Sequence, residues 1–329
     1  MSFRLGGADG VAVEAGKWAG ALGQLGWSVE TVAGEGEADR LLPGLAIAAT
    51  EPPSLRDVES ALAAADLVVV ENLCSLPLNP AAADAVARVL RGRPAVLHHH
   101  DLPWQRPLLG YVGPPPDDPA WAHVTVNDLS RCELAARGID AVTVRNAFDP
   151  DPPSGDREGA RAAVGVPHGA TVVLQPTRAI PRKRVAAGLA LAEALGATFW
   201  LTGPAEEGWG SELEGLVAGA AVPVVHRGVP DVADAYAAAD LVVLPSAWEG
   251  FGNPAVEAGL HGRPVAVGPY PVAVELRSLG FAWFDADDPA TVRLPADAEV
   301  ARNRAVARRE LNLDDLPKRL AAVVDGLQW

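Results

Sequence analysis

The stretch LVVLPSAWEGFGNPAVEAG, residues 241–259, decides the fold of this 329-residue chain. Its apolar start, Leu241–Pro245, predicts a buried strand, and the segment Asn253–His261 predicts a helix with Pro254 in its first turn. Two glycines between them allow the backbone to approach a ligand closely. A strand, a glycine-rich loop and a helix in this order are typical of a parallel α/β sheet.

The same alternation extends in both directions. Segments of strand length are Ser28–Ala33, Leu67–Val70, Ala95–His98, His123–Val126, Ala141–Val144, Thr171–Gln175, Thr198–Thr202, Val222–His226, Leu241–Pro245 and Val265–Gly268. Segments of helical period are Val11–Leu25, Ala81–Arg91, Leu129–Arg137, Arg184–Leu195, Val232–Ala238 and Asn253–His261. A Pro- and Asp-rich stretch, Phe148–Asp156, separates the two series of strands. We therefore predict two doubly wound α/β domains joined by this linker.

Composition indicates a soluble globular protein, with 49% hydrophobic and 21% charged residues. No apolar run approaches the roughly 18 residues that span a bilayer. Asp9 and Glu14 interrupt the first 20 residues where a secretory signal needs an apolar run, so a cytoplasmic location is expected. Cys74 and Cys132 lack CxxC spacing, so the sequence indicates neither a zinc knuckle nor a disulfide framework. Both cysteines are expected to be buried as small hydrophobic residues.

The net charge of −15 arises from 42 acidic and 27 basic residues. Binding to nucleic acid or to an anionic membrane needs a positive face, so neither partner is expected. Only three of the basic residues are lysines, Lys17, Lys183 and Lys318, which makes the position of each one informative.

Ligands of doubly wound sheets bind beyond the carboxyl ends of the strands. The loop after Thr171–Gln175 carries four cations in seven positions, Arg178, Arg182, Lys183 and Arg184. A guanidinium and an ammonium together suit a diphosphate, although a solvated basic loop would have the same composition.

In the opening stretch, the start of the helix offers free N–H groups to a phosphate. Glu257 falls on the first turns of that helix, where its carboxylate could accept hydrogen bonds from a diol such as a ribose. A glycine-rich turn followed by a helix-stabilising glutamate is the alternative interpretation.

With both segments considered, the chain resembles the retaining GT-B enzymes of glycosyltransferase family 4 over nearly its whole length. Glu249 and Glu257 match the E-x7-E motif of that family, and Arg178 with Lys183 matches its R-x4-K pair. Further matches are Asp240–Ser246, Gly262–Val265, Val144–Asp149 and Gly6-Gly7 followed by Val11–Leu25. In departure from the pattern, only Ser2–Leu5 precede the glycine-rich loop.

The resemblance implies two Rossmann-like domains that face a central cleft. Residues 1–149 would bind the acceptor, and residues 150–305 would bind a nucleotide sugar. Residues 306–329 would form a C-terminal helix that packs back on the N-terminal domain.

The resemblance also implies roles for individual residues in the second domain. Arg178 and Lys183 would hold the diphosphate, Glu257 the ribose hydroxyls, and Glu249 the hydroxyls of the donor sugar. The backbone of the intervening loop would meet the sugar and the phosphates, and this loop consists of Gly250, Phe251, Gly252 and Asn253.

In the first domain, Gly6 and Gly7 would form the glycine-rich loop on the donor side. His100 occupies the place of the family's histidine beside the donor sugar and the leaving group. Asp101 and Trp104 follow it and are candidates for acceptor contacts, although Trp104 could equally be a core aromatic residue.

A zinc site formed by His98, His99 and His100 is the competing interpretation of the histidine run. Adjacent residues of an extended segment point to opposite faces, so three neighbours make a poor ligand set. We therefore expect His100 to face the cleft and one or both of the other histidines to pack structurally. We also expect no Asp-x-Asp metal motif at the end of a strand. The resemblance implies that the cations take the place of a metal.

The resemblance thus implies a retaining, metal-independent glycosyltransferase without a cofactor. Its substrates would be a nucleotide-diphosphate sugar and a small-molecule or glycan acceptor. A soluble acceptor is expected because residues 1–149 carry 11 basic and 19 acidic side chains, a net charge of −8. A non-catalytic nucleotide-sugar-binding protein and a GT-B sugar-nucleotide epimerase or phosphorylase are the alternatives. A Rossmann dehydrogenase is disfavoured because residues 6–10, GGADG, are not G-x-G-x-x-G.

Overall fold

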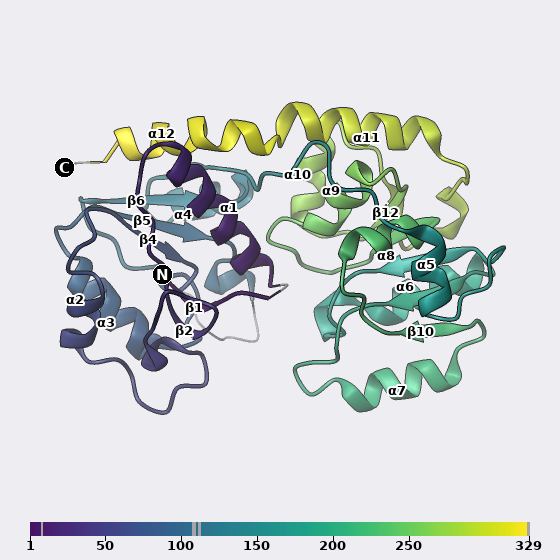
Figure 1. The fold of residues 1–329 in the computed structure, drawn as a ribbon, viewed down its shortest axis with the longest axis horizontal. Coiled ribbons are helices and arrows are strands. Elements are labelled where there is room, and N and C mark those ends of the chain that lie inside the picture. Colours follow the sequence, from purple (N-terminus) through teal and green to yellow (C-terminus); the bar gives the residue numbers. More distant parts are fainter. Residues whose placement is uncertain (8, 107–109, 111–112, 328–329) are drawn as a thin grey trace. The chain divides into compact units, whose positions relative to one another are not determined.

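The computed structural model describes all residues except 8, 107–109, 111–112 and 328–329. The chain divides into two compact units (Figure 1). Unit 1 contains residues 1–147 and 313–329, and unit 2 contains residues 148–312. Each unit is built around a parallel sheet, as the alternation of strand and helix segments predicts.

Unit 1 has a seven-stranded sheet in the order β3-β2-β1-β4-β5-β6-β7. Its strands are β1 Ser2–Leu5, β2 Val32–Gly36, β3 Arg40–Leu41, β4 Val68–Glu71, β5 Ala95–His99, β6 Trp121–Thr125 and β7 Ala141–Thr143. Its helices are α1 Gly10–Gln24, α2 Leu55–Ala61, α3 Pro80–Leu90, α4 Asp128–Ala135 and α12 Leu316–Asp325. Helices α2 and α3 share one hydrophobic core with the sheet, and α1 and α12 share another.

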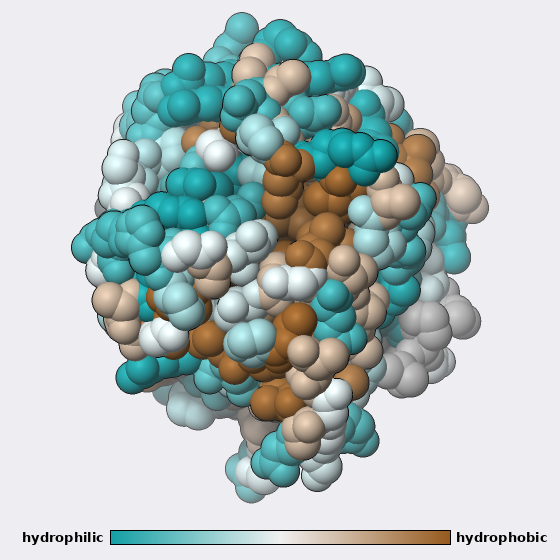
Figure 2. Space-filling model, turned by 90° about the vertical axis from the view of Figure 1, so that its right-hand side faces the viewer, coloured by the Kyte–Doolittle hydropathy of each residue, from teal (hydrophilic) through white to brown (hydrophobic). Residues whose placement is uncertain are grey.

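Unit 2 has a six-stranded sheet in the order β10-β9-β8-β11-β12-β13. Its strands are β8 Val172–Gln175, β9 Thr198–Leu201, β10 Val224–His226, β11 Leu241–Leu244, β12 Val265–Val267 and β13 Phe284–Asp285. Its helices are α5 Arg157–Ala163, α6 Val185–Ala194, α7 Gly210–Gly219, α8 Val232–Ala238, α9 Asn253–Leu260, α10 Pro271–Ser278 and α11 Asp297–Glu310. Figure 2 shows hydrophobic residues in patches between hydrophilic ones on one side of the molecule.

Both sheets reverse their strand order between the first and the fourth strand of the unit. Loops at such a switch point diverge to opposite faces of the sheet and leave a crevice between them. In unit 1 this point lies between β1 and β4, and in unit 2 it lies between β8 and β11. The two cation- and glycine-rich loops singled out in the sequence follow β8 and β11, so strand order alone places them side by side.

Several sequence predictions need correction. The strand predicted at Ser28–Ala33 begins four residues later, as β2, where Ala33, Glu35 and Gly36 pair with β1. Ser2–Leu5 form β1 in full. Cys132 is exposed, because it lies on the outer face of the short helix α4, whereas Cys74 is buried as expected.

The C-terminal segment is not one helix. Helix α11 ends at Glu310 in unit 2, and α12 begins at Leu316 in unit 1. Helix α12 buries Leu320 and Val324 in the same core as Trp18 of α1. Among the residues that the structure describes, no helix has the length and apolar character needed to cross a membrane.

Candidate active site

In unit 2, the loop that follows β8 turns through a short 3-10 helix, Pro181–Lys183, before α6 begins. Gln175, at the end of β8, donates a side-chain hydrogen bond to the carbonyl of Lys183 at 2.9 Å. The neighbouring loop after β11 is tied to this one because the N–H of Ala247 donates to the carbonyl of Arg182 at 2.9 Å. The two loops therefore form one backbone-linked surface.

Lys183 and Glu249 meet in this surface as a buried ion pair. The Lys183 ammonium lies 2.5 Å from Oε1 of Glu249, although 66 positions separate the two residues. The same oxygen accepts the Ser246 hydroxyl at 2.5 Å, and the other oxygen accepts from the Arg182 guanidinium at 3.3 Å. Three donors thus hold one carboxylate. The sequence analysis assigned no role to Ser246, which precedes Glu249 by three residues.

Electrostatics favour an ionised Glu249. Burial by itself disfavours the carboxylate, but the charges of Lys183 and Arg182 and the hydrogen bonds hold the pKa of Glu249 below its usual range. Burial lowers the pKa of Lys183, and the charges of Arg182 and Arg178 act in the same direction, whereas Glu249 opposes them. A concentrated positive field therefore surrounds one fixed carboxylate, which suits an anionic ligand with hydroxyl groups.

Arg178 lies at the same strand end but makes a different contact. Its guanidinium pairs with Glu206 at 2.7 Å, and 38% of its side chain is exposed. Arg184 takes the left-handed conformation at the start of α6 and pairs with Asp287 at 2.8 Å. Of the four predicted cations, the structure thus groups Lys183 and Arg182 around Glu249.

Glu257 lies on α9, one helix turn beyond the loop. Its carboxylate accepts the Tyr236 hydroxyl at 2.6 Å. Tyr236 is fully buried, and burial together with the Glu257 charge raises its pKa well above the ordinary value, so the hydroxyl stays protonated. The sequence analysis did not identify Tyr236, which carries no motif signal on α8.

Gly252 ends the glycine-rich loop with φ +98° and caps α9. A Cβ atom at this position would lie 2.2 Å from the Tyr270 hydroxyl, so both the conformation and the space require glycine. Phe251 is buried and stacks with Phe148 at 6.1 Å between ring centroids, which anchors the loop. Any contact of Phe251 with a ligand would therefore come from its backbone. Gly250 and Asn253 flank these two residues at the start of the helix.

In unit 1, Gly6 and Gly7 follow β1 with φ +87° and +69°. A Cβ on Gly6 would lie 2.9 Å from the Cβ of Glu37. Helix α1 then begins at Gly10, with the Asp9 carboxylate accepting the N–H of Val11 at 2.8 Å. The loop is thus a tight turn at the switch point of this sheet.

The three histidines separate to the two faces of the sheet, as their alternation predicts. His99 accepts or donates a hydrogen bond with the Ser75 hydroxyl at 2.6 Å and with His123 at 2.9 Å. His98 stacks on Trp18, with 4.0 Å between ring centroids. All three histidines are buried, and His100 retains a side-chain exposure of 9%.

Glu71, which the sequence analysis missed, joins His98 and His100. One oxygen of its carboxylate lies 2.8 Å from Nδ1 of His98 and 2.8 Å from Nε2 of His100. These ligand-type atoms lie within 4.8 Å of one another, so their spacing would also suit a metal ion. Glu71 directly follows the predicted strand Leu67–Val70, and ligands of such sheets bind at strand ends, so its position could have identified it as a candidate.

The two acceptor candidates of unit 1 are held by other side chains. Asp101 pairs with Arg106 at 3.1 Å. The indole N–H of Trp104 donates to Glu133 at 2.8 Å, and the Arg137 guanidinium lies 3.7 Å from the ring centroid. One face of the Trp104 ring is therefore already covered, and an acceptor role for this residue stays a prediction.

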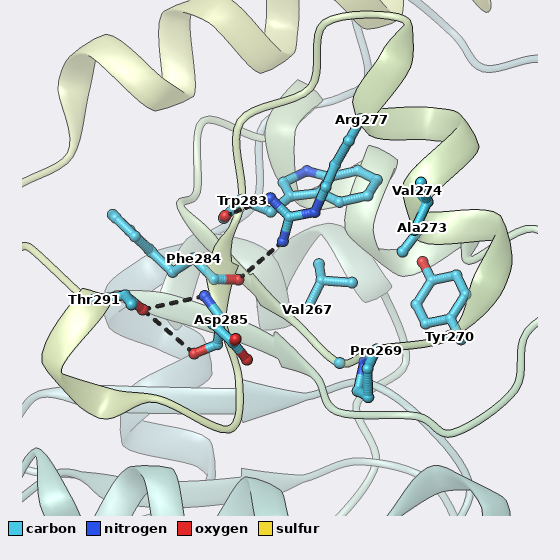
Figure 3. Close-up of a pocket in the computed structure, with 11 residues that line it drawn as sticks. Val267, Pro269, Tyr270, Ala273, Val274, Arg277, Trp283, Phe284, Asp285 and Thr291 are labelled. Atoms are coloured by element: carbon cyan, nitrogen blue, oxygen red, sulfur yellow. Dashed lines mark hydrogen bonds between the residues drawn. The ribbon is translucent and has the colours of Figure 1, made fainter.

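The expectation that no Asp-x-Asp motif lies at a strand end was wrong, because Asp285, the last residue of β13, begins the sequence Asp285-Ala286-Asp287. This strand was not predicted. Asp285 accepts the N–H of Asp287 at 2.9 Å, and Asp287 pairs with Arg184. Asp285 also borders a concavity of about 440 Å³ with Arg277 and Trp283 (Figure 3). None of the predicted site residues lines it.

Comparisons with known proteins find similarity to glycosyltransferases. Residues 178–290 match the family model described as glycosyl transferases group 1, and this range contains both loops of unit 2. Mannosylglucosylglycerate synthase of Thermotoga maritima is 28% identical over 248 residues, which cover 63% of this chain and 58% of the relative. D-inositol 3-phosphate glycosyltransferase of Mycobacterium sp. (strain KMS) is 36% identical over 199 residues, which cover 55% of this chain and 42% of the relative. The chain thus spans about half the length of the curated relatives it matches.

A structural likeness covers the whole chain. The crystal structure of Anabaena Alr3699/HepE in complex with UDP-glucose superposes with a TM-score of 0.73, at 20% identity, over 99% of this chain and 98% of that one. This likeness confirms the predicted GT-B fold of two Rossmann-like α/β domains.

Proposed function

We propose that this protein is a retaining, metal-independent glycosyltransferase of the family 4 type. It transfers a sugar from a nucleoside-diphosphate sugar to a hydroxyl group of a small acceptor. The observation that carries the proposal is the buried carboxylate of Glu249 held by Lys183, Arg182 and Ser246 at the switch point of unit 2. This cluster lies within the part of the chain that matches the glycosyl transferases group 1 model.

The candidate site residues have separate tasks in this reaction. Lys183 and Arg178 bind the diphosphate, and their charges stabilise the leaving group as a metal ion would. Glu257, oriented by Tyr236, binds the ribose hydroxyls. Glu249 binds hydroxyls of the donor sugar, and His100 of unit 1 is assigned to the same sugar, as the resemblance implies.

In the proposed reaction, the bond between the anomeric carbon and the diphosphate oxygen breaks, and the acceptor oxygen forms the new bond on the same face. The departing phosphate oxygen takes the acceptor proton. Glu249 is assigned as a binding group and not a nucleophile, as the resemblance implies. Its carboxylate already accepts three hydrogen bonds, which occupy its oxygens.

A soluble acceptor is favoured by charge. Residues 1–149 carry a net charge of −8. The cationic side chains at and just beyond the end of α3, Arg88, Arg91 and Arg93, form a weak patch. Arg88 pairs with Asp84 at 2.9 Å, and Arg93 donates to two backbone carbonyls. The names of the two relatives also point to small hydroxylated molecules. Strong sedimentation with anionic liposomes at about 0.15 M salt, lost in an Arg88/Arg91/Arg93→Ser variant, would contradict a soluble acceptor.

A screen of UDP-, GDP- and ADP-sugars by thermal shift tests the donor assignment. A ligand at 100 times its dissociation constant stabilises the folded state by about 2.7 kcal/mol, which is readily seen. The stabilising donor is then incubated with candidate acceptors in EDTA, and the anomeric configuration of the product is read by NMR. Absence of any shift would contradict the proposal. Binding without turnover would favour a nucleotide-sugar-binding protein, and inversion or loss of activity in EDTA would contradict the mechanism.

A further inference from the structure

Two neighbouring strands of unit 1 bring a carboxylate against two imidazoles. Glu71 is the last residue of β4, and it pairs in register with His98 of β5. His98 and His100 are two positions apart and point to the same side. Oε2 of Glu71 accepts from Nδ1 of His98 and Nε2 of His100, both at 2.8 Å, and the exposed side-chain fractions are 4%, 0% and 9%.

We propose that Glu71 is a positioning residue for His100. By accepting the Nε2–H of His100, its carboxylate fixes the ring and presents Nδ1 as the nitrogen available to a ligand. Nδ1 forms no hydrogen bond to another described residue, and the 9% exposure of the side chain gives this ring an accessible edge. The inference rests on the proposed function, because it assumes that His100 contacts the donor sugar.

The backbone around the two residues is fixed as well. Asn72, which follows Glu71, has φ +59°, and its side-chain oxygen accepts the N–H of His100 at 3.1 Å and that of Asp101 at 3.3 Å. Glu71 thus holds the ring of His100 while Asn72 holds its main chain. Such a fixed geometry is what preorganised contact with a reacting sugar requires.

His98 acts as the second anchor of the carboxylate. Its ring is clamped by stacking on Trp18, and its Nδ1 donates to the same oxygen that binds His100. With that oxygen held from two sides, Glu71 cannot turn away from His100 without leaving a buried donor unpaired.

The same contacts favour a hydrogen-bonded cluster over a metal site. Both imidazoles are already satisfied by the carboxylate at 2.8 Å. Metal-binding histidines usually donate their second ring N–H to an outer partner. Nε2 of His98 is buried and has no partner among the described residues. We therefore do not assign these residues as metal ligands.

The charges that face His100 support the same arrangement. Burial alone would disfavour the imidazolium, but the hydrogen bond and charge of Glu71, with Glu14 of α1 and Asp101, raise the pKa of His100. The amino group of Met1 is also close enough to Glu71 to interact with it. A charged His100 would present Nδ1 as a hydrogen-bond donor, which suits a sugar hydroxyl or a phosphate oxygen.

The test compares Glu71→Gln and Glu71→Asp with the wild-type chain. Asp117→Asn is the matched control, because it removes a carboxylate that contacts another histidine of the same sheet, His123, at 3.1 Å. Glu71→Gln should lower kcat by about tenfold to 100-fold, by analogy with the loss of a carboxylate that orients a metal-binding histidine. The KM for the donor should change little, Glu71→Asp should recover part of kcat, and Asp117→Asn should resemble the wild type.

A second measurement does not depend on turnover. Titration of the histidine ring nitrogens by NMR, with His100→Gln used to assign the signal, should give His100 a pKa above its ordinary value in the wild type and a lower one in Glu71→Gln. An ordinary or lowered pKa in the wild type would overturn the inference even if Glu71→Gln does not fold. Equal kcat values in Glu71→Gln and Asp117→Asn would also overturn it. Stoichiometric binding of zinc by the wild type, abolished in Glu71→Gln, would overturn it as well. If the wild type turns over no nucleotide sugar, the proposed function itself fails.

Discussion

Replacing Lys183 with methionine tests the donor site directly. The substitution keeps the length of the side chain and removes the ammonium group. In the structure this ammonium donates to Glu249 at 2.5 Å and has two further N–H groups. If these bind the diphosphate, the variant loses at least one charge-assisted hydrogen bond, worth about 1.5–3 kcal/mol. The dissociation constant of the nucleoside diphosphate should then rise by about tenfold to 150-fold.

The fold should survive this change. Breaking one side of a buried ion pair costs about 3–5 kcal/mol when the remaining charge has no partner. Here Glu249 keeps the Ser246 hydroxyl and the Arg182 guanidinium, so we expect a loss of about 3 kcal/mol or less. Thermal unfolding measures this cost separately from binding.

Titration calorimetry with UDP, GDP and ADP provides the assay, and the nucleotide that binds the wild type most tightly is used for the variants. Lys318→Met is the matched control, because Lys318 is exposed on α12 and belongs to unit 1. The dissociation constant of the Lys318→Met variant for the nucleotide should equal that of the wild type. A folded Lys183→Met variant that binds the nucleotide within about twofold of the control would refute the diphosphate assignment.

Three further substitutions test other parts of unit 2. Glu257→Ala should weaken the binding of the sugar nucleotide and of the bare nucleoside diphosphate alike, whereas Glu249→Ala should mainly impair sugar recognition and turnover. Calorimetry measures both affinities, and an equal loss of affinity for the two ligands in Glu249→Ala would contradict this division. Gly252→Ala should cost about 1–3 kcal/mol through its positive φ alone, with a further loss from the clash with a tyrosine hydroxyl, and an unchanged melting temperature would contradict the geometry. Asp240→Asn should cost about 3 kcal/mol, because it leaves the buried guanidinium of Arg161 without its counter-charge. The contacts with Arg157 and Arg161 hold the pKa of Asp240 below its usual range despite partial burial, so this carboxylate stabilises the fold above its unfolded-state pKa and loses that effect as the pH falls. Between pH 7 and about pH 3, the free energy of unfolding should therefore change less in Asp240→Asn than in the wild type. An equal change in both proteins would contradict this assignment.

The sequence by itself determined the fold class and the segments that carry the candidate site. Hydrophobic periodicity is a local property, so strands such as β11 and helices such as α9 could be placed within a residue or two. The rule that ligands bind at strand ends then selected the loops containing Lys183 and Glu249. Edge strands with few apolar residues were missed, β13 among them, because two residues carry no periodic signal.

Only the tertiary structure decided which side chains meet. The pairing of Lys183 with Glu249 spans 66 positions, and that of Glu71 with His100 spans 29. Both depend on strand order, which places β8 beside β11 and β4 beside β5. A single sequence contains no local signal for that order, because pairing energy is gained only when distant strands share a sheet. The direction of a side chain such as Arg178, which turns to Glu206, depends in addition on the packing of its neighbours, and that is fixed only in the folded chain.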